Sequence, residues 1–304
     1  MTTFRLGINT CFAVKRWPDP ESWLAVVSDL GLDLVQHSLD LVDLDASDAD
    51  LRHQASTVAA ACQDAGIALH STFTGLAAYS SNMLLHPDRA RRDRAAAWYR
   101  RAVDFTAAAG AGSTGGHVGA YSVADWADAD RRAALWNSLQ AELDGLAAYA
   151  RDAGLDSLMV ENLAVPREPS SMAGIRSLLN QGDTWHVPIV ACVDVGHQCV
   201  LGASGAELDP YAWLTELGAF APIVQLQQSD AVADHHWPFT PALNAVGRIE
   251  APRVLQAIAA SGAADVALIL EIIHPFEAGD DQVVADLRES VEYWRRHLTD
   301  AEES

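Results

Sequence analysis

Short apolar segments alternate with longer amphipathic segments along the whole chain. The apolar segments have the length and composition of buried strands, and we expect strands at residues 4–9, 32–38, 67–73, 113–119, 157–162, 188–197, 222–228 and 265–273. The segments between them, such as "RRDRAAAWYRRAVDFTAAAG", have helical spacing and end at glycines suited to helix C-caps. Apolar strands that alternate with helices are typical of a parallel sheet.

Eight such units in 304 residues predict an α/β fold, a single (β/α)8 TIM barrel that spans residues 1–304 as one domain. The alternative is a doubly wound open sheet, which normally carries a glycine-rich nucleotide fingerprint. The segment "GAGSTGG" at 110–116 does not match G-x-G-x-x-G. We find no linker or low-complexity stretch that would mark a boundary between domains.

The formal net charge of −21 repels phosphate backbones, so we expect no nucleic-acid partner. The basic run "RARRDR" at 89–94 is interpreted as a solvated helix face. The four cysteines form no CxxC pair, and "MTTFRLGINT" lacks the pattern of a signal peptide. No apolar run reaches transmembrane length. These features predict a cytoplasmic protein with no membrane partner.

Polar residues stand at or just after the ends of the expected strands. In a parallel barrel these ends form one rim, where catalytic groups lie. In chain order the residues are Asn9, His37, His70, His117, Glu161, Asn162, Asp194, His197, Gln225, Gln227, Glu271 and His274, with His235 and His236 after the seventh strand. This concentration of histidines predicts a functional rim.

Four of these residues interrupt strongly apolar strands: Glu161, Asp194, Gln225 and Glu271. Three carboxylates and an amide at one rim would be costly unless a cation lay among them. Oxygen ligands favour Mn²⁺ or Mg²⁺, so we predict one divalent ion bound by these four side chains. The alternative is that each is satisfied separately by backbone or an ion pair. Gln227 shares the strand face of Gln225, so the register decides which amide faces the ion.

The motifs "ENL", "DVGH", "VQLQQSD" and "LEI" after or within the last four strands resemble the xylose isomerase-like barrel superfamily, and more narrowly the ketose 3-epimerases and hydroxypyruvate isomerases. The resemblance implies that Glu161 and Glu271 bind the metal and also act as acid and base. It implies that Asp194 is a ligand and that His197 contacts a substrate oxygen. Gln225 stands where the epimerases have histidine, as in the hydroxypyruvate isomerase-like branch.

The segments "NTCFAVKRWPDPESW", "STFTGLAAYSSNMLLHPD" and "QQSDAVADHHWPF" are similar to the erythrulose-phosphate epimerases of tetritol catabolism. The resemblance implies an isomerase of carbohydrate metabolism, acting on a small sugar or sugar phosphate as a homodimer or homotetramer. One glutamate would remove a proton beside a carbonyl, and the other would return it from the opposite face. Return to the neighbouring carbon would interconvert aldose and ketose instead.

Further residues are candidates for substrate binding. Lys15 and Arg16 follow the first strand and could hold a phosphate, helped by His235 or His236; alternatively Arg16 forms a surface ion pair and Lys15 is solvated. The alternative for "DHHW" is a structural histidine packed on a tryptophan. His70 and His117 are pocket candidates or buried core histidines, and Tyr79 and Asn82 lie in a loop that could act as a lid.

Three other functions compete. An apurinic-site endonuclease on the same fold would need a histidine-rich zinc cluster and a basic groove, which the charge and Gln225 argue against. A metal-dependent sugar lyase or C-glycoside deglycosidase subunit would use the same residue types. A non-catalytic sugar-binding barrel would not need both Glu161 and Glu271.

Overall fold

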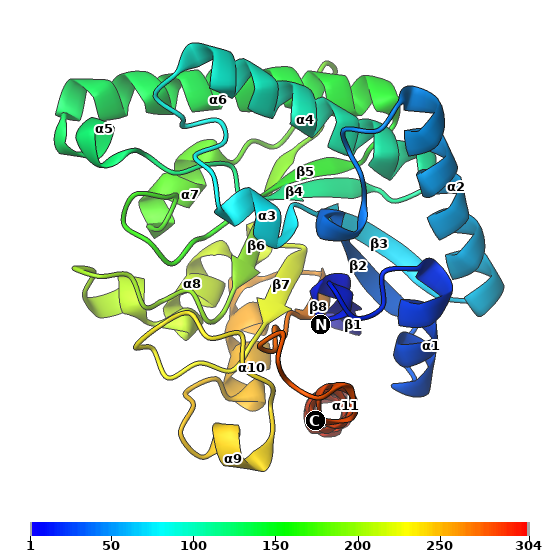
Figure 1. Cartoon of the computed structure of the whole chain (residues 1–304). Coiled ribbons are helices and arrows are strands. Elements are labelled where there is room, and N and C mark those ends of the chain that lie inside the picture. Colours follow the sequence, from blue (N-terminus) through cyan, green and yellow to red (C-terminus); the bar gives the residue numbers. More distant parts are fainter. Residues whose placement is uncertain (1, 303–304) are drawn as a thin grey trace. The chain divides into compact units, whose positions relative to one another are not determined.

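The computed structural model describes residues 2–302 and is shown in Figure 1. Its eight strands follow one another in chain order around a closed parallel barrel. The strands are β1 (Thr3–Asn9), β2 (Leu34–Ser38), β3 (Ala68–Phe73), β4 (Ser113–Gly116), β5 (Ser157–Glu161), β6 (Ile189–Asp194), β7 (Ile223–Leu226) and β8 (Asp265–Leu270). The predicted fold class, a (β/α)8 TIM barrel, is therefore confirmed.

Helices occupy the segments between the strands. The α-helices are α1 (Pro20–Asp29), α2 (Asp48–Ala65), α3 (Gly75–Tyr79), α4 (Arg89–Ala108), α5 (Val123–Ala127), α6 (Ala129–Ala153), α7 (Met172–Leu178), α8 (Pro210–Leu217), α9 (Pro241–Asn244), α10 (Ala251–Ser261) and α11 (Asp280–Glu302). The short 3₁₀ helices are η1 (Thr10–Ala13), η2 (Leu39–Leu41), η3 (Gly205–Leu208) and η4 (Gly218–Phe220). None of the helices within residues 2–302 combines the length and the hydropathy needed to traverse a bilayer.

The expected strands all coincide with observed ones, with differences at their ends. Three strands end three residues before their expected ends: β4 ends at Gly116, β6 at Asp194 and β8 at Leu270. Gly116 has a φ of +129°, and a Cβ there would lie 2.5 Å from Thr74 Oγ1. The chain leaves the extended conformation at this glycine, so His117 follows the strand directly.

The contacts within the chain divide it into two compact units. The prediction of a single domain stays a prediction. The first unit comprises the described residues up to Gln36, Ala61–Ala68 and those from Cys192 onward. In it β1 pairs with β2 and β8, and β7 pairs with β6 and β8, all parallel. Its fully buried aromatic side chains include those of Trp213 and Trp294.

The second unit comprises His37–Ala60 and Leu69–Ala191. Here β4 pairs in parallel with β3 and β5, and Figure 1 shows α4 and α6 side by side along these strands. Leu139 and Leu146 of α6 are buried in one apolar cluster with Val160 of β5. This packing of apolar faces holds the carboxyl end of β5, and therefore Glu161, in place.

Polar residues set the ends of the two long helices of this unit. Asp88 accepts a hydrogen bond from the Ala90 amide before α4, and Asp128 accepts from the amide of Asp130 before α6. Gly154, with a φ of 91°, ends α6 in the left-handed conformation expected of a C-cap glycine. The basic run lies at the start of α4, where Arg89 pairs with Asp93 on an exposed face.

Candidate functional site

A layer of buried polar side chains lies among β1, β2, β7 and β8 in the first unit. The register places Asn9 beside Gln36. Asn9 Nδ2 donates to Gln36 Oε1 at 2.8 Å and to Glu271 Oε1 at 3.1 Å. Gln225 Nε2 donates to the same two oxygens, at 2.9 and 3.0 Å. Two amides therefore fix one oxygen of Glu271 and orient its carboxyl group.

The other oxygen of Glu271 is buried and receives no hydrogen bond from the described residues. The nearest cationic group is His236 Nδ1, 3.7 Å away. Burial raises the pKa of Glu271 to about 8; His236 lowers it in part, and the nearby Asp194 raises it further. A buried carboxyl group with one fixed and one open oxygen is suited to binding a cation or exchanging a proton.

Asp194 ends β6 and lies beside Gln225 in the register. Its Oδ1 accepts hydrogen bonds from the Gly196 amide at 2.6 Å and from Gln227 Nε2 at 3.1 Å. A Cβ at residue 196 would lie 2.2 Å from Gln227 Cδ, so only glycine leaves room for that amide. This explains the glycine of "DVGH": it lets the loop after β6 approach the side chain that contacts Asp194.

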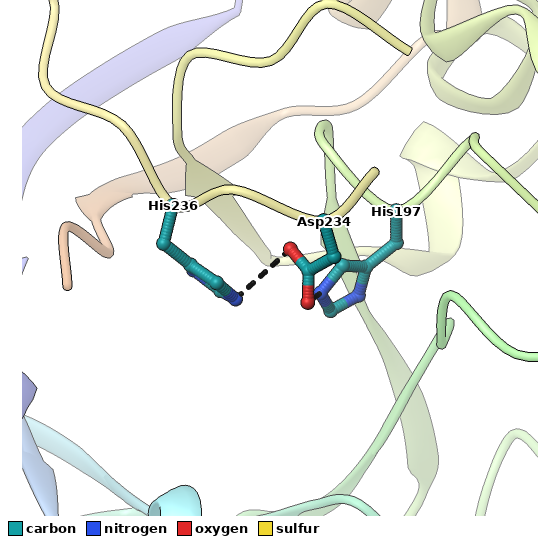
Figure 2. Close-up of side chains that lie close together, drawn as sticks. All are labelled: His197, Asp234 and His236. Carbon is teal, nitrogen blue, oxygen red and sulfur yellow. Dashed lines mark ion pairs between the residues drawn. The ribbon is translucent and has the colours of Figure 1, made fainter. Parts of the chain in front are cut away.

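Asp234, in the loop after β7, lies between two histidines (Figure 2). Its Oδ1 is 3.1 Å from His236 Nε2, and its Oδ2 is 3.3 Å from His197 Nε2. Burial opposes ionisation of Asp234, but His197 and His236 outweigh it and hold its pKa well below the usual range. Burial likewise opposes protonation of His236, yet Asp234, then Glu271 and Asp194, raise its pKa to about 9.

The Asp234 carboxylate was not among the predicted site residues, although both histidines were. The chain supplies one signal for it: an aspartate two residues before His236 in a polar loop that follows a strand end. Gln227 was named only as the alternative to Gln225. Both amides are fully buried, and Gln227 Nε2 reaches Asp234 Oδ1 at 2.9 Å in addition to Asp194.

Glu161, His117 and Tyr79 form a second polar cluster, which belongs to the second unit. Glu161 ends β5 and is fully buried. Tyr79, the last residue of α3, donates from its hydroxyl to Glu161 Oε2 at 2.6 Å. Its ring stacks on His117, with centroids 4.8 Å apart and planes 23° apart. Burial lowers the pKa of His117 to about 4, so its imidazole is neutral at pH 7.

The two basic residues after β1 differ in their surroundings. Arg16 donates to the carbonyl oxygens of Pro275 and Ala278, at 2.8 and 2.9 Å, and pairs with Asp280. Its guanidinium is thus held by the segment between β8 and α11, which is the ion-pair alternative left open by the sequence. Lys15 is exposed, with its ammonium 4.1 Å from the ring centroid of Phe276.

Two histidines that were predicted to bind substrate have other surroundings: His70 lies within a strand, and His235 contacts other side chains of the protein. His70 was expected at the end of its strand, but β3 continues to Phe73, and His70 Nδ1 lies 3.1 Å from Ser71 Oγ. The expected position of His70 is therefore wrong. His235 stacks on Trp237 at 3.8 Å and pairs with Asp230 at 3.0 Å, which is the structural alternative stated for "DHHW".

The residues of the first unit suit a divalent ion. One ligand atom from each of Asp194, His236 and Glu271 lies within 4.8 Å of the others, and the same holds for His197, Asp234 and His236. The open oxygen of Glu271 faces this group. The carboxylate oxygens of Asp194 and Glu271 match the preferences of Mn²⁺ and similar hard divalent ions. The donor set therefore fits the metal that the sequence predicts.

The chain belongs to the xylose isomerase-like TIM barrel family, whose model matches residues 24–297. It is 29% identical over 302 residues to the D-erythrulose 1-phosphate 3-epimerase of Brucella abortus, a match that covers 96% of both chains. These matches confirm the predicted family and identify the chain as an enzyme of the isomerase class.

Solved structures give the same fold. A crystal structure from Rhodospirillum rubrum, described as a "Putative Xylose isomerase", is 34% identical, with a TM-score of 0.88 over 96% of this chain and 99% of the other. The D-psicose 3-epimerase of Clostridium cellulolyticum, solved with D-tagatose, is 16% identical, with a TM-score of 0.74 over 97% and 99% of the two chains. The second similarity shows the shared barrel alone.

Proposed function

We propose that this chain is a divalent-metal-dependent epimerase that inverts C3 of a small ketose or ketose phosphate, with a tetrulose phosphate as the favoured substrate. The observation that carries the proposal is Glu271, a buried carboxyl group with one oxygen fixed by two amides and the other open beside Asp194 and His236. The end-to-end similarity to an erythrulose-phosphate 3-epimerase supports the choice of substrate.

The proposed ion is Mn²⁺ or Mg²⁺, held by Asp194, Glu271, Glu161 and the amide of Gln225. Glu161 and Asp194 end β5 and β6, Gln225 lies near the end of β7, and Glu271 follows β8 directly. The carboxyl ends of parallel strands in a barrel form one rim. When bound, such an ion polarises the substrate carbonyl and lowers the cost of the enediolate. Gln227 is the alternative amide ligand, because it contacts Asp194.

Mn²⁺ titration of two variants separates these amides. Gln225→Leu should weaken binding about tenfold or more if Gln225 is a ligand, whereas Gln227→Leu should do so if Gln227 is. Isothermal titration calorimetry of both variants beside the parent protein gives the answer without any substrate. An unchanged affinity in both variants would remove the glutamine from the ligand set.

Glu161 and Glu271 are the proposed acid and base. The raised pKa of Glu271, about 8, lies close to neutral pH, where a carboxyl group exchanges protons most effectively. One glutamate takes the C3 proton, and the other returns a proton to the opposite face of the carbon. His197 and His236 are the proposed contacts to substrate oxygens, because Asp234 fixes a ring nitrogen of each. His117 is a further substrate contact in this proposal.

Lys15 is the proposed phosphate contact after β1, since the residue is exposed and its ammonium lies 4.1 Å from the ring centroid of Phe276. Arg16, His70 and His235 are left out of the proposed substrate site. The guanidinium of Arg16 and the ring of His235 already have protein partners, and His70 lies within β3.

Proton NMR in D₂O tests the reaction directly. Mn²⁺-loaded protein is mixed with each enantiomer of erythrulose 1-phosphate, and with unphosphorylated ketoses of four to six carbons as comparison. Deuterium at C3 together with the opposite stereoisomer would establish 3-epimerase chemistry. Glu161→Gln and Glu271→Gln, which keep the shape of each side chain, should each lower the rate about 10³-fold or more.

The second candidate is an aldose–ketose isomerase, favoured by the 34% identity to the Rhodospirillum rubrum protein. It predicts deuterium at C1 or C2 and an aldose product in the same experiment. No conversion of any ketose by metal-loaded protein would contradict both candidates.

A further inference from the structure

The short helix α3 is anchored at its start by a residue from the segment after β2. Asp40 accepts hydrogen bonds from the backbone amides of Leu76 at 2.6 Å and Ala77 at 2.9 Å. Ser38 donates from its hydroxyl to the same carboxylate at 3.1 Å. A Cβ at Gly75 would lie 2.4 Å from Asp40 Oδ2, so glycine is needed for this approach. Asp40 therefore fixes where α3 begins.

The far end of α3 is fixed by the ring of Tyr79 on His117. His117 is itself held by two contacts. Its backbone amide donates to Thr74 Oγ1 at 3.0 Å, and its ring Nε2 lies 3.3 Å from the Ser81 carbonyl oxygen. With the Tyr79 ring stacked on this neutral imidazole, the phenol hydroxyl points at Glu161 Oε2, 2.6 Å away. A hydroxyl donor at this distance stabilises a carboxylate and restricts its rotation.

We propose that Tyr79 is a positioning residue for Glu161, and that Asp40 acts through α3 to hold Tyr79 in place. The inference rests on the proposed function, in which Glu161 transfers a proton at C3. A hydrogen bond to one oxygen of a carboxylate restricts its rotation and favours a fixed reacting geometry. Asp40, Tyr79 and Glu161 all belong to the second unit, so these contacts lie within that unit.

Tyr79→Phe is the sharpest test, because it keeps the ring on His117 and removes only the hydroxyl. We expect kcat to fall about tenfold, with a smaller change in KM, since one charge-assisted hydrogen bond is lost. Tyr149→Phe is the matched control: Tyr149 also donates to a carboxylate, Asp104 Oδ1 at 2.7 Å, on the exposed side of the molecule. The control should leave kcat unchanged.

The decisive measurement is the ratio of exchange to conversion in D₂O for each of the two epimers. If proton transfer at Glu161 alone is slowed, Glu271 protonates the enediolate more often than Glu161 does. The epimer deprotonated by Glu271 should then take up deuterium without converting, several times more often than with the parent protein. The other epimer should show a lower ratio. A general structural defect would slow both directions and leave both ratios unchanged, which would overturn the proposal.

Asp40→Asn tests the anchor of α3. This variant should change the exchange-to-conversion ratios of the two epimers in the same directions as Tyr79→Phe. The factor should be smaller, because a neutral amide still accepts one of the two backbone hydrogen bonds. Combining it with Tyr79→Phe should add little, since both changes act on the same contact. Additive effects would show that Asp40 does not act through Tyr79.

A measurement without substrate separates this inference from the proposed function. In protein labelled with [δ-¹³C]glutamate, the carboxyl signal of Glu161 is identified by its absence from the Glu161→Gln variant. Tyr79→Phe should shift that signal and leave the other glutamate signals in place. An unmoved Glu161 signal would overturn the inference even if the protein is an active epimerase. A shifted signal in a protein that converts no ketose would contradict the proposed function and leave the contact established.

Discussion

Asp234 and His236 form an ion pair, with Oδ1 of the aspartate 3.1 Å from Nε2 of the histidine. The same carboxylate reaches His197 through its other oxygen. His236 in turn lies beside Glu271 and keeps a raised pKa of about 9. Asp234 therefore orients both histidines. It also keeps His236 protonated beside Glu271, the proposed acid/base residue.

Replacing Asp234 by asparagine should lower kcat/KM about 10- to 100-fold, because both histidines lose a charged partner while the loop keeps its shape. Steady-state kinetics with the substrate found by NMR provides the measurement. Asp230→Asn is the matched control: Asp230 pairs with His235 at 3.0 Å in the same loop, outside the proposed site. Equal losses in the two variants would mean that the loop as a whole matters and that the Asp234 pairs do not.

Metal removal gives a second prediction. Dialysis against a chelator should abolish turnover, and Mn²⁺ should restore it. Binding to the folded state alone stabilises it, so saturating Mn²⁺ should raise the melting temperature of the parent protein. Glu271→Gln should show little of this rise, because the proposed ligand with the open oxygen is neutralised. Full activity in protein shown by elemental analysis to be metal-free would contradict a metal-dependent reaction.

The strand order and the three carboxylates at strand ends were accessible from the sequence for a physical reason. Each of Glu161, Asp194 and Glu271 ends or follows an apolar run too short for a helix, and a barrel brings such ends to one rim. Asp234 was not accessible in this way. It lies in a loop, where no periodicity fixes the path of the chain, and its partners are set by the turn that brings His236 back over β8.

Arg16 illustrates the same limit for a basic residue. Its carbonyl partner at Ala278 is 262 positions away in the chain, so the sequence could not decide between an anion contact and a structural one. His70 was misplaced for another reason: the strand expected at 67–73 ends at Phe73 as observed, and His70 lies within that strand and not at its end. Loop paths and strand ends depend on tertiary packing, which local patterns do not encode.

The contacts of Arg16 predict a structural role. Arg16→Ala should lower the free energy of unfolding by about 1–3 kcal/mol, because two carbonyl oxygens and Asp280 lose their donor. The KM for a phosphorylated substrate should change little, whereas Lys15→Ala should raise it. Denaturant titration and steady-state kinetics together make the distinction. Arg89→Ala, which breaks an exposed pair with Asp93, is the control and should change the free energy of unfolding far less.

His37 predicts how stability depends on pH. It lies in β2 and is almost fully buried, with its ring facing Phe105 of α4 at 6.1 Å. Burial lowers its pKa from 6.5 to about 4. Between these two values the unfolded chain binds a proton that the folded chain does not, so the contribution of His37 to stability is fully present above pH 6.5 and falls as the pH decreases toward 4.

His37→Gln, which cannot take up that proton, should therefore make the loss of stability on acidification shallower. The difference in slope should approach about 1 kcal/mol per pH unit between pH 6 and 5. The free energy of unfolding, measured by urea titration at several pH values, provides the comparison. His53→Gln, at an exposed position of α2, is the control for replacing a histidine by glutamine. Identical slopes for the parent and His37→Gln would mean that His37 is protonated equally in both states, contrary to its burial.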